Sequence, residues 1–312
     1  MTSTDPWVSV HLFHQGEQDR LVLDLVAPVV TELREHGLTD RWFYLRYWNG
    51  GPHLRLRVLA RTEEAREEIR SVLAARCTGH LARSPSPDLV DQQTYLEQAR
   101  RFGALEGVEP VERMYANNSV HLLPYTREHD RYGRGDSLEA VERHFCESSD
   151  LALRILGSRP EPTQRETTVL TFLLLSWFTA AEDVGALARR QLDHAAERIR
   201  FHGPESAERS ADALYESSRE RLERIAATAG RVVRARDRLR PGSLTDWARS
   251  VGRMTDALRV SGPGDAPAST TGVADLCTHL FANRIGVRID AEGSLRYLAA
   301  RAVTETTMPE EA

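Results

Sequence analysis

Two arginines and a histidine alternate with apolar residues in the segment HLRLRVL, residues 53–59. Side chains of a β-strand point alternately to opposite faces, so His53, Arg55 and Arg57 would share one face of a sheet. A guanidinium group stays charged and forms paired hydrogen bonds with a carboxylate or phosphate. The spacing therefore predicts a cationic face that binds an anion. The alternative is that nearby Asp and Glu side chains of the chain itself neutralise the arginines.

A hairpin is expected to bring a third arginine to this face. The segment RWFYLRYW, residues 41–48, is followed by NGGP, and glycine-rich turns of this kind join antiparallel strands. If Trp48 lies opposite His53, then Arg46 lies opposite Arg55. Like charges directly opposite one another destabilise a sheet, so this register favours an anionic partner for the arginines.

A second polar group precedes a predicted helix, in the segment YTREHDRYG, residues 125–133. Glu128 and Arg131 are three residues apart, and Tyr132 is followed by a glycine in a predicted turn. Glu128 either orients Arg131 toward a ligand or simply forms an ion pair with it. The residues of this segment allow both interpretations.

A third polar group lies on a predicted helix, in the segment THLFANRIG, residues 278–286. His279 stands about one helical turn before Asn283, and Arg284 follows directly. Histidine changes its charge near neutral pH, so His279 could act as a general acid or base. On a mostly apolar helix, the same side chain could instead be a hydrogen-bonded core histidine.

The elements that must position these residues fall into two parts of different character. Alternating apolar residues predict strands over 7–14, 41–48 and 53–59, and residues 82–93 are expected to form a loop. Helices are expected over 19–37, 62–77, 136–156, 164–184, 210–239, 243–260, 273–286 and 291–304. The chain is therefore predicted to be α+β, with a mostly antiparallel sheet and flanking helices followed by a mainly helical half. We expect one composite domain, 1–312, with a sheet-containing half, 1–135, and a helical half, 136–312.

Composition narrows the class of protein. The 312 residues carry a net charge of −5, which does not favour a nucleic-acid-binding surface. Cys77, Cys146 and Cys277 are far apart and are expected to be buried free thiols, and no metal site is expected. The N-terminus lacks the pattern of a signal peptide, and the apolar run at 169–178 is too short to cross a bilayer. A cytoplasmic location without membrane attachment is therefore expected.

The segments WFYLRYWNGGPHLRLR, YTREHDRYG and THLFANRIG, in this order, resemble the thiopeptide-type bacteriocin biosynthesis domain. This is also the C-terminal glutamate-elimination domain of class I lantibiotic dehydratases, and the resemblance extends from Trp7 to about Val303. In this family a larger domain esterifies Ser or Thr of a ribosomally made precursor peptide with glutamate from glutamyl-tRNA. The elimination domain then expels glutamate to leave dehydroalanine or dehydrobutyrine. The resemblance implies a stand-alone elimination component of a split dehydratase, a lyase without a cofactor.

The resemblance also implies roles for the three polar groups. The residues expected to be catalytic are Arg55, Arg57, Glu128, Arg131 and His279. The residues expected to bind substrate are Arg46, His53, Tyr132, Asn283 and Arg284. The implied partners are the precursor peptide and a separate tRNA-dependent glutamylating subunit, and a homodimer is allowed.

Two other functions stay open at this point. Relatives with the same fold are pyridine synthases, which join two dehydroalanines by a formal [4+2] cycloaddition and expel the leader peptide. Those relatives tend to depart from the arginine and histidine motifs, which this chain retains. A further alternative is a non-catalytic scaffold that binds the leader peptide along the edge of its sheet.

Overall fold

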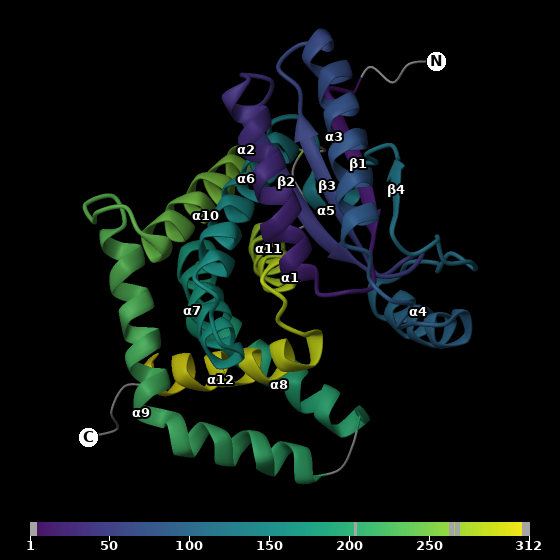
Figure 1. Ribbon diagram of the computed structural model, residues 1–312. Coiled ribbons are helices and arrows are strands. Elements are labelled where there is room, and N and C mark those ends of the chain that lie inside the picture. The colour runs from purple at the N-terminus through teal and green to yellow at the C-terminus, as the bar shows by residue number, and fades with distance from the viewer. Residues whose placement is uncertain (1–4, 203–204, 262–264, 266–268, 308–312) are drawn as a thin grey trace, which may run out of the picture. The chain divides into compact units, whose positions relative to one another are not determined.

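The computed structural model describes residues 5–202, 205–261, 265 and 269–307 (Figure 1). The chain divides into two compact units. The first unit comprises residues 1–127 and 152–158, and the second comprises 128–151 and 159–312. The predicted α+β class is confirmed, because the strands lie near the N-terminus and the remainder is mostly helical. The single composite domain, with its halves meeting at residues 135 and 136, stays a prediction.

The first unit contains a four-stranded sheet. Its strands are β1 (Trp7–Phe13), β2 (Arg41–Tyr47), β3 (His53–Leu59) and β4 (Ser119–Leu122). They follow the order β2-β3-β1-β4, and every neighbouring pair is antiparallel. The first three strands confirm the predicted ones to within one residue. β4 was not predicted, because four residues with two polar side chains give too short an alternation to detect.

The predicted register of the hairpin was wrong by one residue. Tyr47, not Trp48, lies opposite His53, so Arg46 pairs with Leu54 rather than with Arg55. The loop has five residues because Trp48 joins the turn, where its carbonyl oxygen accepts a hydrogen bond from the N–H of Gly51. A shift of one residue moves a side chain to the opposite face of the sheet. Arg46 therefore lies on the other face from Arg55, and this removes the reason for placing it with them.

The helices of the first unit cover the face that carries Arg46. The cation of Arg46 forms an ion pair with Asp19 of α1, at 2.6 Å. Arg34 of α2 lies over the ring of Trp42, which is also on this face. The alternating valines and leucines of β1 and β3 point the same way and are almost fully buried. The opposite face carries Arg55 and Arg57, and we call it the arginine face.

The helices of the first unit begin with a segment that the periodicity predicted as one helix over 19–37. It consists of α1 (Gln18–Leu21), a π-helical stretch η1 (Val22–Val26) and α2 (Ala27–Glu35). Pro28 has no N–H to donate to the preceding turn, which explains why the widened turn lies just before it. The other helices are α3 (Glu63–Arg83) and α4 (Gln92–Glu106). The predicted loop over 82–93 is shorter than expected, and α4 was missed.

The second unit is built around α7 (Pro162–Ala180), whose apolar residues are nearly all buried. Around it pack α8 (Val184–His202), α9 (Glu205–Ala235), α10 (Ser243–Val260), α11 (Thr270–Arg284) and α12 (Ile289–Thr307). A short helix, α5 (His129–Tyr132), precedes α6 (Gly135–Gly157), whose last residues count with the first unit. The bounds of α10 agree with the prediction, whereas α8 was not predicted.

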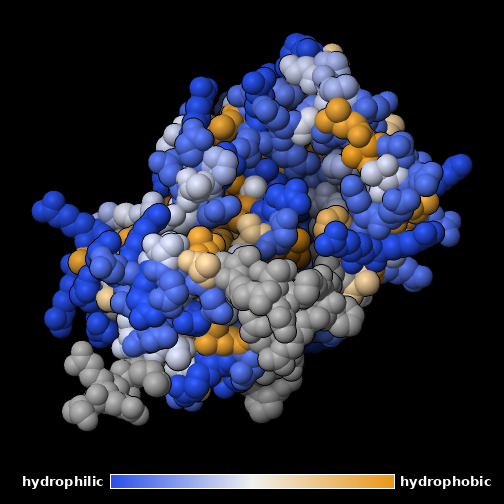
Figure 2. All heavy atoms as spheres, turned by 90° about the horizontal axis from the view of Figure 1, so that it is seen from below, coloured by the Kyte–Doolittle hydropathy of each residue, from blue (hydrophilic) through white to orange (hydrophobic). Residues whose placement is uncertain are grey.

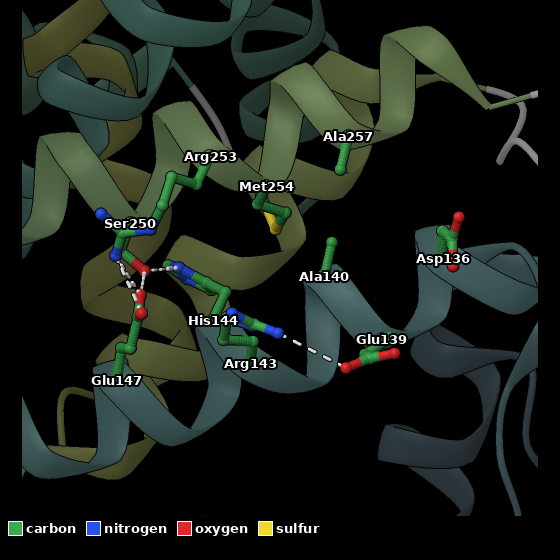
Figure 3. A pocket seen from close by; sticks show the side chains of 10 residues that line it. All are labelled: Asp136, Glu139, Ala140, Arg143, His144, Glu147, Ser250, Arg253, Met254 and Ala257. Atoms are coloured by element: carbon green, nitrogen blue, oxygen red, sulfur yellow. Dashed lines mark hydrogen bonds and ion pairs between the residues drawn. The ribbon is translucent and has the colours of Figure 1, made fainter.

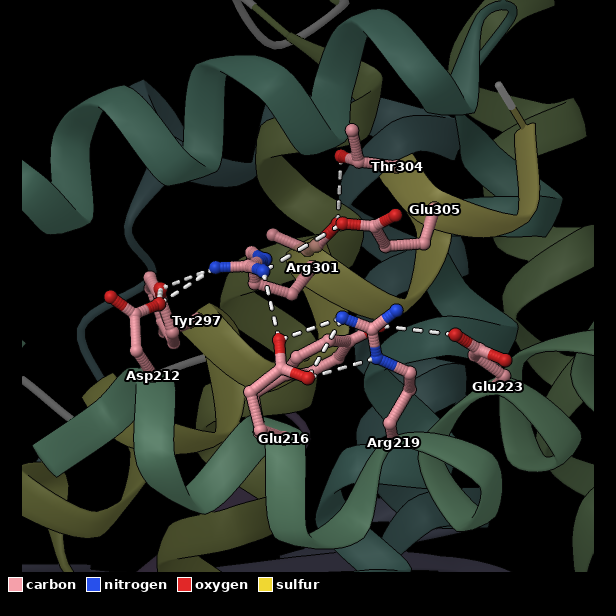
Figure 4. A network of polar contacts seen from close by, with 10 residues as sticks. Asp212, Glu216, Arg219, Glu223, Tyr297, Arg301, Thr304 and Glu305 are labelled. Atoms are coloured by element: carbon pink, nitrogen blue, oxygen red, sulfur yellow. Dashed lines mark hydrogen bonds and ion pairs between the residues drawn. The ribbon is translucent and has the colours of Figure 1, made fainter. Parts of the chain in front are cut away.

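A network of polar contacts joins α12 to α9 (Figure 4). Arg301 of α12 forms an ion pair with Asp212 of α9 at 2.7 Å, and the hydroxyl of Tyr297 donates to the same carboxylate. Glu216 of α9 and Glu305 of α12 lie within 3.7 Å of the other side of Arg301. Since several charges share one network, it holds the two helices more firmly than isolated surface ion pairs would.

The surface and the cysteines agree with a globular chain. Figure 2 shows a face covered mostly by hydrophilic residues, with apolar residues in small separate patches. Among the described residues, no helix is both long and apolar enough to cross a membrane. Cys77, Cys146 and Cys277 are buried free thiols, as predicted.

Candidate functional site

The guanidinium of Arg55 on the arginine face is held between an aromatic ring and a histidine. Its central carbon lies 3.4 Å from the centre of the Tyr47 ring, and its Nε donates to Nε2 of His53 at 3.3 Å. Nδ1 of His53 in turn donates to the carbonyl oxygen of Gly51 at 2.8 Å. Both ring nitrogens of His53 are thus hydrogen-bonded, and its side chain is fully buried. This geometry fixes Arg55 through His53.

Neutral histidines surround the cation of Arg55. Burial is the main cause that lowers the pKa of His53 from 6.5 to about 3, and the charges of Arg55 and Arg57 add to it. His11 lies opposite Arg55 in the sheet and stacks on His53 with ring centres 5.0 Å apart. Burial and its positively charged neighbours lower the pKa of His11 to about 2. Both rings are therefore uncharged at neutral pH and do not compete with the arginines for an anion.

Arg57 has an aromatic environment of the same kind. Its guanidinium lies 4.1 Å from the centre of the Tyr125 ring and 5.3 Å from that of Phe43. Only 8% of the residue is exposed. When a guanidinium stacks on an aromatic ring, its flat face contacts the ring. Its N–H groups point outward in the plane of the group, where they can donate to the two oxygens of a carboxylate. The arginine face is thus chemically suited to a carboxylate.

The second polar group forms one short turn in the second unit. Arg131 and Glu128 make an ion pair at 3.1 Å, with roughly half of each side chain exposed. Tyr132 is buried and packs edge-to-face on Phe145. Gly133 follows with φ of 81°, and a Cβ there would collide with the backbone carbonyl oxygen of Asp265. The glycine of this motif is therefore required for the turn that presents Arg131.

The third polar group centres on His279 of α11. Its Nδ1 lies 2.9 Å and 3.2 Å from the two carboxylate oxygens of Glu292, in the first turn of α12. The histidine side chain is 30% exposed, and that of Glu292 only 7%. Glu292 was not among the predicted site residues, although a glutamate near the start of a helix and close in sequence to His279 was a possible signal.

The two residues that follow His279 differ in their surroundings. Asn283 is half-buried. Arg284 is fully buried, donates to the hydroxyl of Ser148 at 3.1 Å and lies 5.5 Å from the Phe145 ring centre. Arg284 therefore lies in the interior of the second unit. Its predicted contact with substrate stays a prediction, as does that of Asn283.

The second unit also contains a pocket that the sequence did not indicate (Figure 3). It lies between α6 and α10 and has a volume of about 310 Å³. Buried His144 donates from Nδ1 to the hydroxyl of Ser250 at 2.8 Å, and Ser250 donates to Glu147. Arg253 then contacts both oxygens of Glu147 at 2.8 Å. The polar groups at this end of the pocket thus bind one another.

The buried ring of His144 predicts a dependence of stability on pH. Burial, followed by the charges of Arg284 and Arg253, lowers the pKa of His144 from 6.5 to about 3. Between these pH values the unfolded chain binds the proton and the folded chain does not, so stability falls as pH falls. We expect His144→Gln to reduce this slope by about 1.4 kcal/mol per pH unit. Urea unfolding of the wild type and the variant at several pH values between 6.5 and 3 measures how the free energy of unfolding changes with pH. Equal slopes in the two proteins would contradict the burial of a neutral ring.

The structure brings the predicted residues into three groups. Within the first unit, His53, Arg55 and Arg57 share the arginine face. Within the second unit, Glu128 is paired with Arg131, and His279 is paired with Glu292. Among the residues that the structure describes, no cluster of three or more His, Cys, Asp or Glu is arranged to hold a metal ion.

Known structures share this fold. The pyridine synthase TbtD from thiomuracin biosynthesis is 19% identical with a TM-score of 0.79, and the match covers 96% of this chain and 98% of TbtD. The tRNA-dependent lantibiotic dehydratase MibB from Microbispora sp. 107891 is 21% identical with a TM-score of 0.59. That match covers 98% of this chain but only 28% of MibB.

Sequence comparison agrees with the structural one. The epidermin biosynthesis protein EpiB of Staphylococcus epidermidis is 26% identical over 117 residues, which are 36% of this chain and 12% of EpiB. The chain therefore aligns with only a small part of that curated relative. A family model described as lantibiotic biosynthesis dehydratase C-term matches residues 7–303. From this match over nearly its whole length, the chain belongs to the lantibiotic biosynthesis dehydratase C-terminal family.

Proposed function

We propose that this protein eliminates glutamate from glutamylated Ser or Thr residues of a ribosomally made precursor peptide. The products are dehydroalanine from serine and dehydrobutyrine from threonine. Membership of the dehydratase C-terminal family supports this class of reaction. The observation that carries the proposal is the arginine face, where the guanidinium carbons of Arg55 and Arg57 lie 3.4 Å and 4.1 Å from the ring centres of Tyr47 and Tyr125.

The reaction removes the Cα proton of the modified residue and breaks the bond between Cβ and the ester oxygen. The electron pair of the C–H bond forms the double bond, and the glutamate leaves as a carboxylate. That glutamate carries a second carboxylate, which Arg55 and Arg57 would bind with paired hydrogen bonds. Arg131 would stabilise the negative charge that develops on the peptide carbonyl oxygen, and Glu128 would orient Arg131. His279 would move a proton, giving it to the leaving carboxylate.

The partners follow from this chemistry. The substrate must already be glutamylated, so a separate tRNA-dependent subunit would supply it. The precursor peptide would be the direct ligand of this protein.

A second candidate function is pyridine synthesis by formal [4+2] cycloaddition of two dehydroalanines, with release of the leader peptide. The observation that favours it is the similarity to TbtD, because the match extends over 98% of that chain with a TM-score of 0.79. This likeness concerns the fold alone, whereas the arginine and histidine motifs favour elimination.

One experiment separates the two functions. The protein is incubated alone with a synthetic precursor peptide that carries one glutamylated serine, and the products are analysed by mass spectrometry. We expect free glutamate and a peptide with one dehydroalanine. A second substrate carries two dehydroalanines and no glutamate; release of the leader together with a new ring would replace the elimination proposal by cycloaddition.

A further inference from the structure

Glu292 is an unusual residue for its position. It lies in the first turn of α12, where most acidic side chains are solvated, yet only 7% of its side chain is exposed. A buried carboxylate is costly unless it is paired and hydrogen-bonded. Among the side chains that the structure describes, His279 alone hydrogen-bonds the carboxylate of Glu292. The burial of Glu292 is therefore compensated mainly through the imidazole of His279.

The contact determines which nitrogen of His279 carries the proton. An ionised carboxylate only accepts hydrogen bonds, so the nitrogen that faces it must be the donor. That nitrogen is Nδ1, at 2.9 Å and 3.2 Å from the two oxygens. In a neutral ring, the lone pair then resides on Nε2. The carboxylate thus selects one tautomer and fixes the orientation of the ring.

Both helices that carry this pair are held in place. α11 packs on α7 and α10, the central helices of the second unit. α12 is tied to α9 by the network of Arg301, Tyr297 and Asp212 (Figure 4). Glu292 and His279 therefore both lie on packed helices rather than on loops, and such elements position a side chain more precisely than loops do.

We infer that Glu292 is a positioning residue for His279: it holds the ring as the Nδ1–H tautomer, with the lone pair on Nε2. An effect of Glu292 on the reaction rate rests on the proposed function of His279, whereas its effect on the tautomer of the ring does not. Glu292 would also stabilise the imidazolium when the ring is protonated, as a carboxylate beside a general-base histidine does.

The tautomer is measured directly by NMR of protein labelled with ¹⁵N at histidine, from long-range couplings between ring protons and nitrogens at a pH where the ring is neutral. The signals of His279 are assigned by their loss in His279→Gln. We expect the Nδ1–H pattern in the wild type and a large share of the Nε2–H form, which free imidazole side chains prefer, in Glu292→Ala. Asp290→Asn is the matched control, since Asp290 is an exposed carboxylate in the same turn, paired with Arg288 at 3.0 Å. An Nε2–H ring in the wild type, or no change in Glu292→Ala, would overturn the inference.

Kinetics test the consequence for catalysis. We expect Glu292→Ala to lower kcat for elimination roughly tenfold to hundredfold at unchanged KM, the loss that is usual when the hydrogen-bonding partner of a metal-ligating histidine is removed. Adding Glu292→Ala to His279→Gln should cause no further loss, because residues that act as a unit are not additive. A merely structural role would lower the melting temperature without changing the tautomer. If His279→Gln retains elimination, the proposed function of His279 fails, while the NMR result still decides the role of Glu292.

Discussion

Replacement of His279 should make the glutamylated peptide accumulate. We expect His279→Ala and His279→Gln to slow glutamate release by ~10²–10⁴-fold, the usual contribution of a general acid or base. The peptide should keep the mass of its glutamyl ester instead of losing glutamate. Mass spectrometry of the peptide over time measures both species.

The glutamine variant is the more informative of the two. Alanine leaves the buried carboxylate of Glu292 without its partner, which can itself destabilise the fold. Glutamine offers an N–H donor to that carboxylate but cannot transfer a proton at neutral pH. We therefore expect His279→Gln to melt near the wild-type temperature and still to release glutamate ~10²–10⁴-fold more slowly than the wild type. Wild-type rates of dehydration in both variants would remove His279 from the mechanism.

The second large effect concerns recognition of the glutamyl group by the arginine face. We expect Arg55→Gln and Arg57→Gln each to weaken binding of the glutamylated peptide by roughly 30-fold or more. Truncating one partner of a buried charge pair costs about 2–5 kcal/mol, and about 1.4 kcal/mol is a factor of ten. The lysine variants should have affinities between those of the wild type and the glutamine variants, because lysine keeps the charge but loses the planar pair of donors. Calorimetric titration with the peptide in its glutamylated and unmodified forms measures the difference.

Two controls make the result specific. Arg61 lies two residues beyond the end of β3, is half exposed and pairs with Asp40, so Arg61→Gln should bind both peptides as the wild type does. The unmodified peptide should bind all variants equally, because it lacks the carboxylate that the arginines recognise. Equal affinity of Arg57→Gln and the wild type for the glutamylated peptide would contradict the assignment, provided that both are folded by their melting temperatures.

The parts of the fold that sequence could predict are those with strong local periodicity. The alternation in β1 and β3 and the apolar stripe of α10 gave elements close to the observed ones. The register of the hairpin was lost because it depends on whether Trp48 belongs to the strand or to the turn, and the composition of NGGP allows both. β4 is held by pairing with β1, which is distant in sequence, so its own four residues carried little information.

The candidate site, too, could be predicted where it depends on local sequence spacing and not where it depends on contacts between residues distant in the sequence. The spacing of Arg55 and Arg57 placed them on one face, and this was confirmed. The burial of that face could not be predicted, because the ring of Tyr125 comes from a segment with no regular structure. Glu292 was missed because its importance arises from a contact between two helices, which no spacing along a single helix reveals.

The division of the chain into two units has a consequence for how the protein can be cut. The chain passes from one unit to the other three times, after residues 127, 151 and 158. No single truncation therefore separates the units, since residues 1–127 would lack 152–158 and the remainder would retain them. An exchange between two relatives at any one of these crossings would therefore join incomplete units, whereas an exchange of the whole segment would keep both units complete.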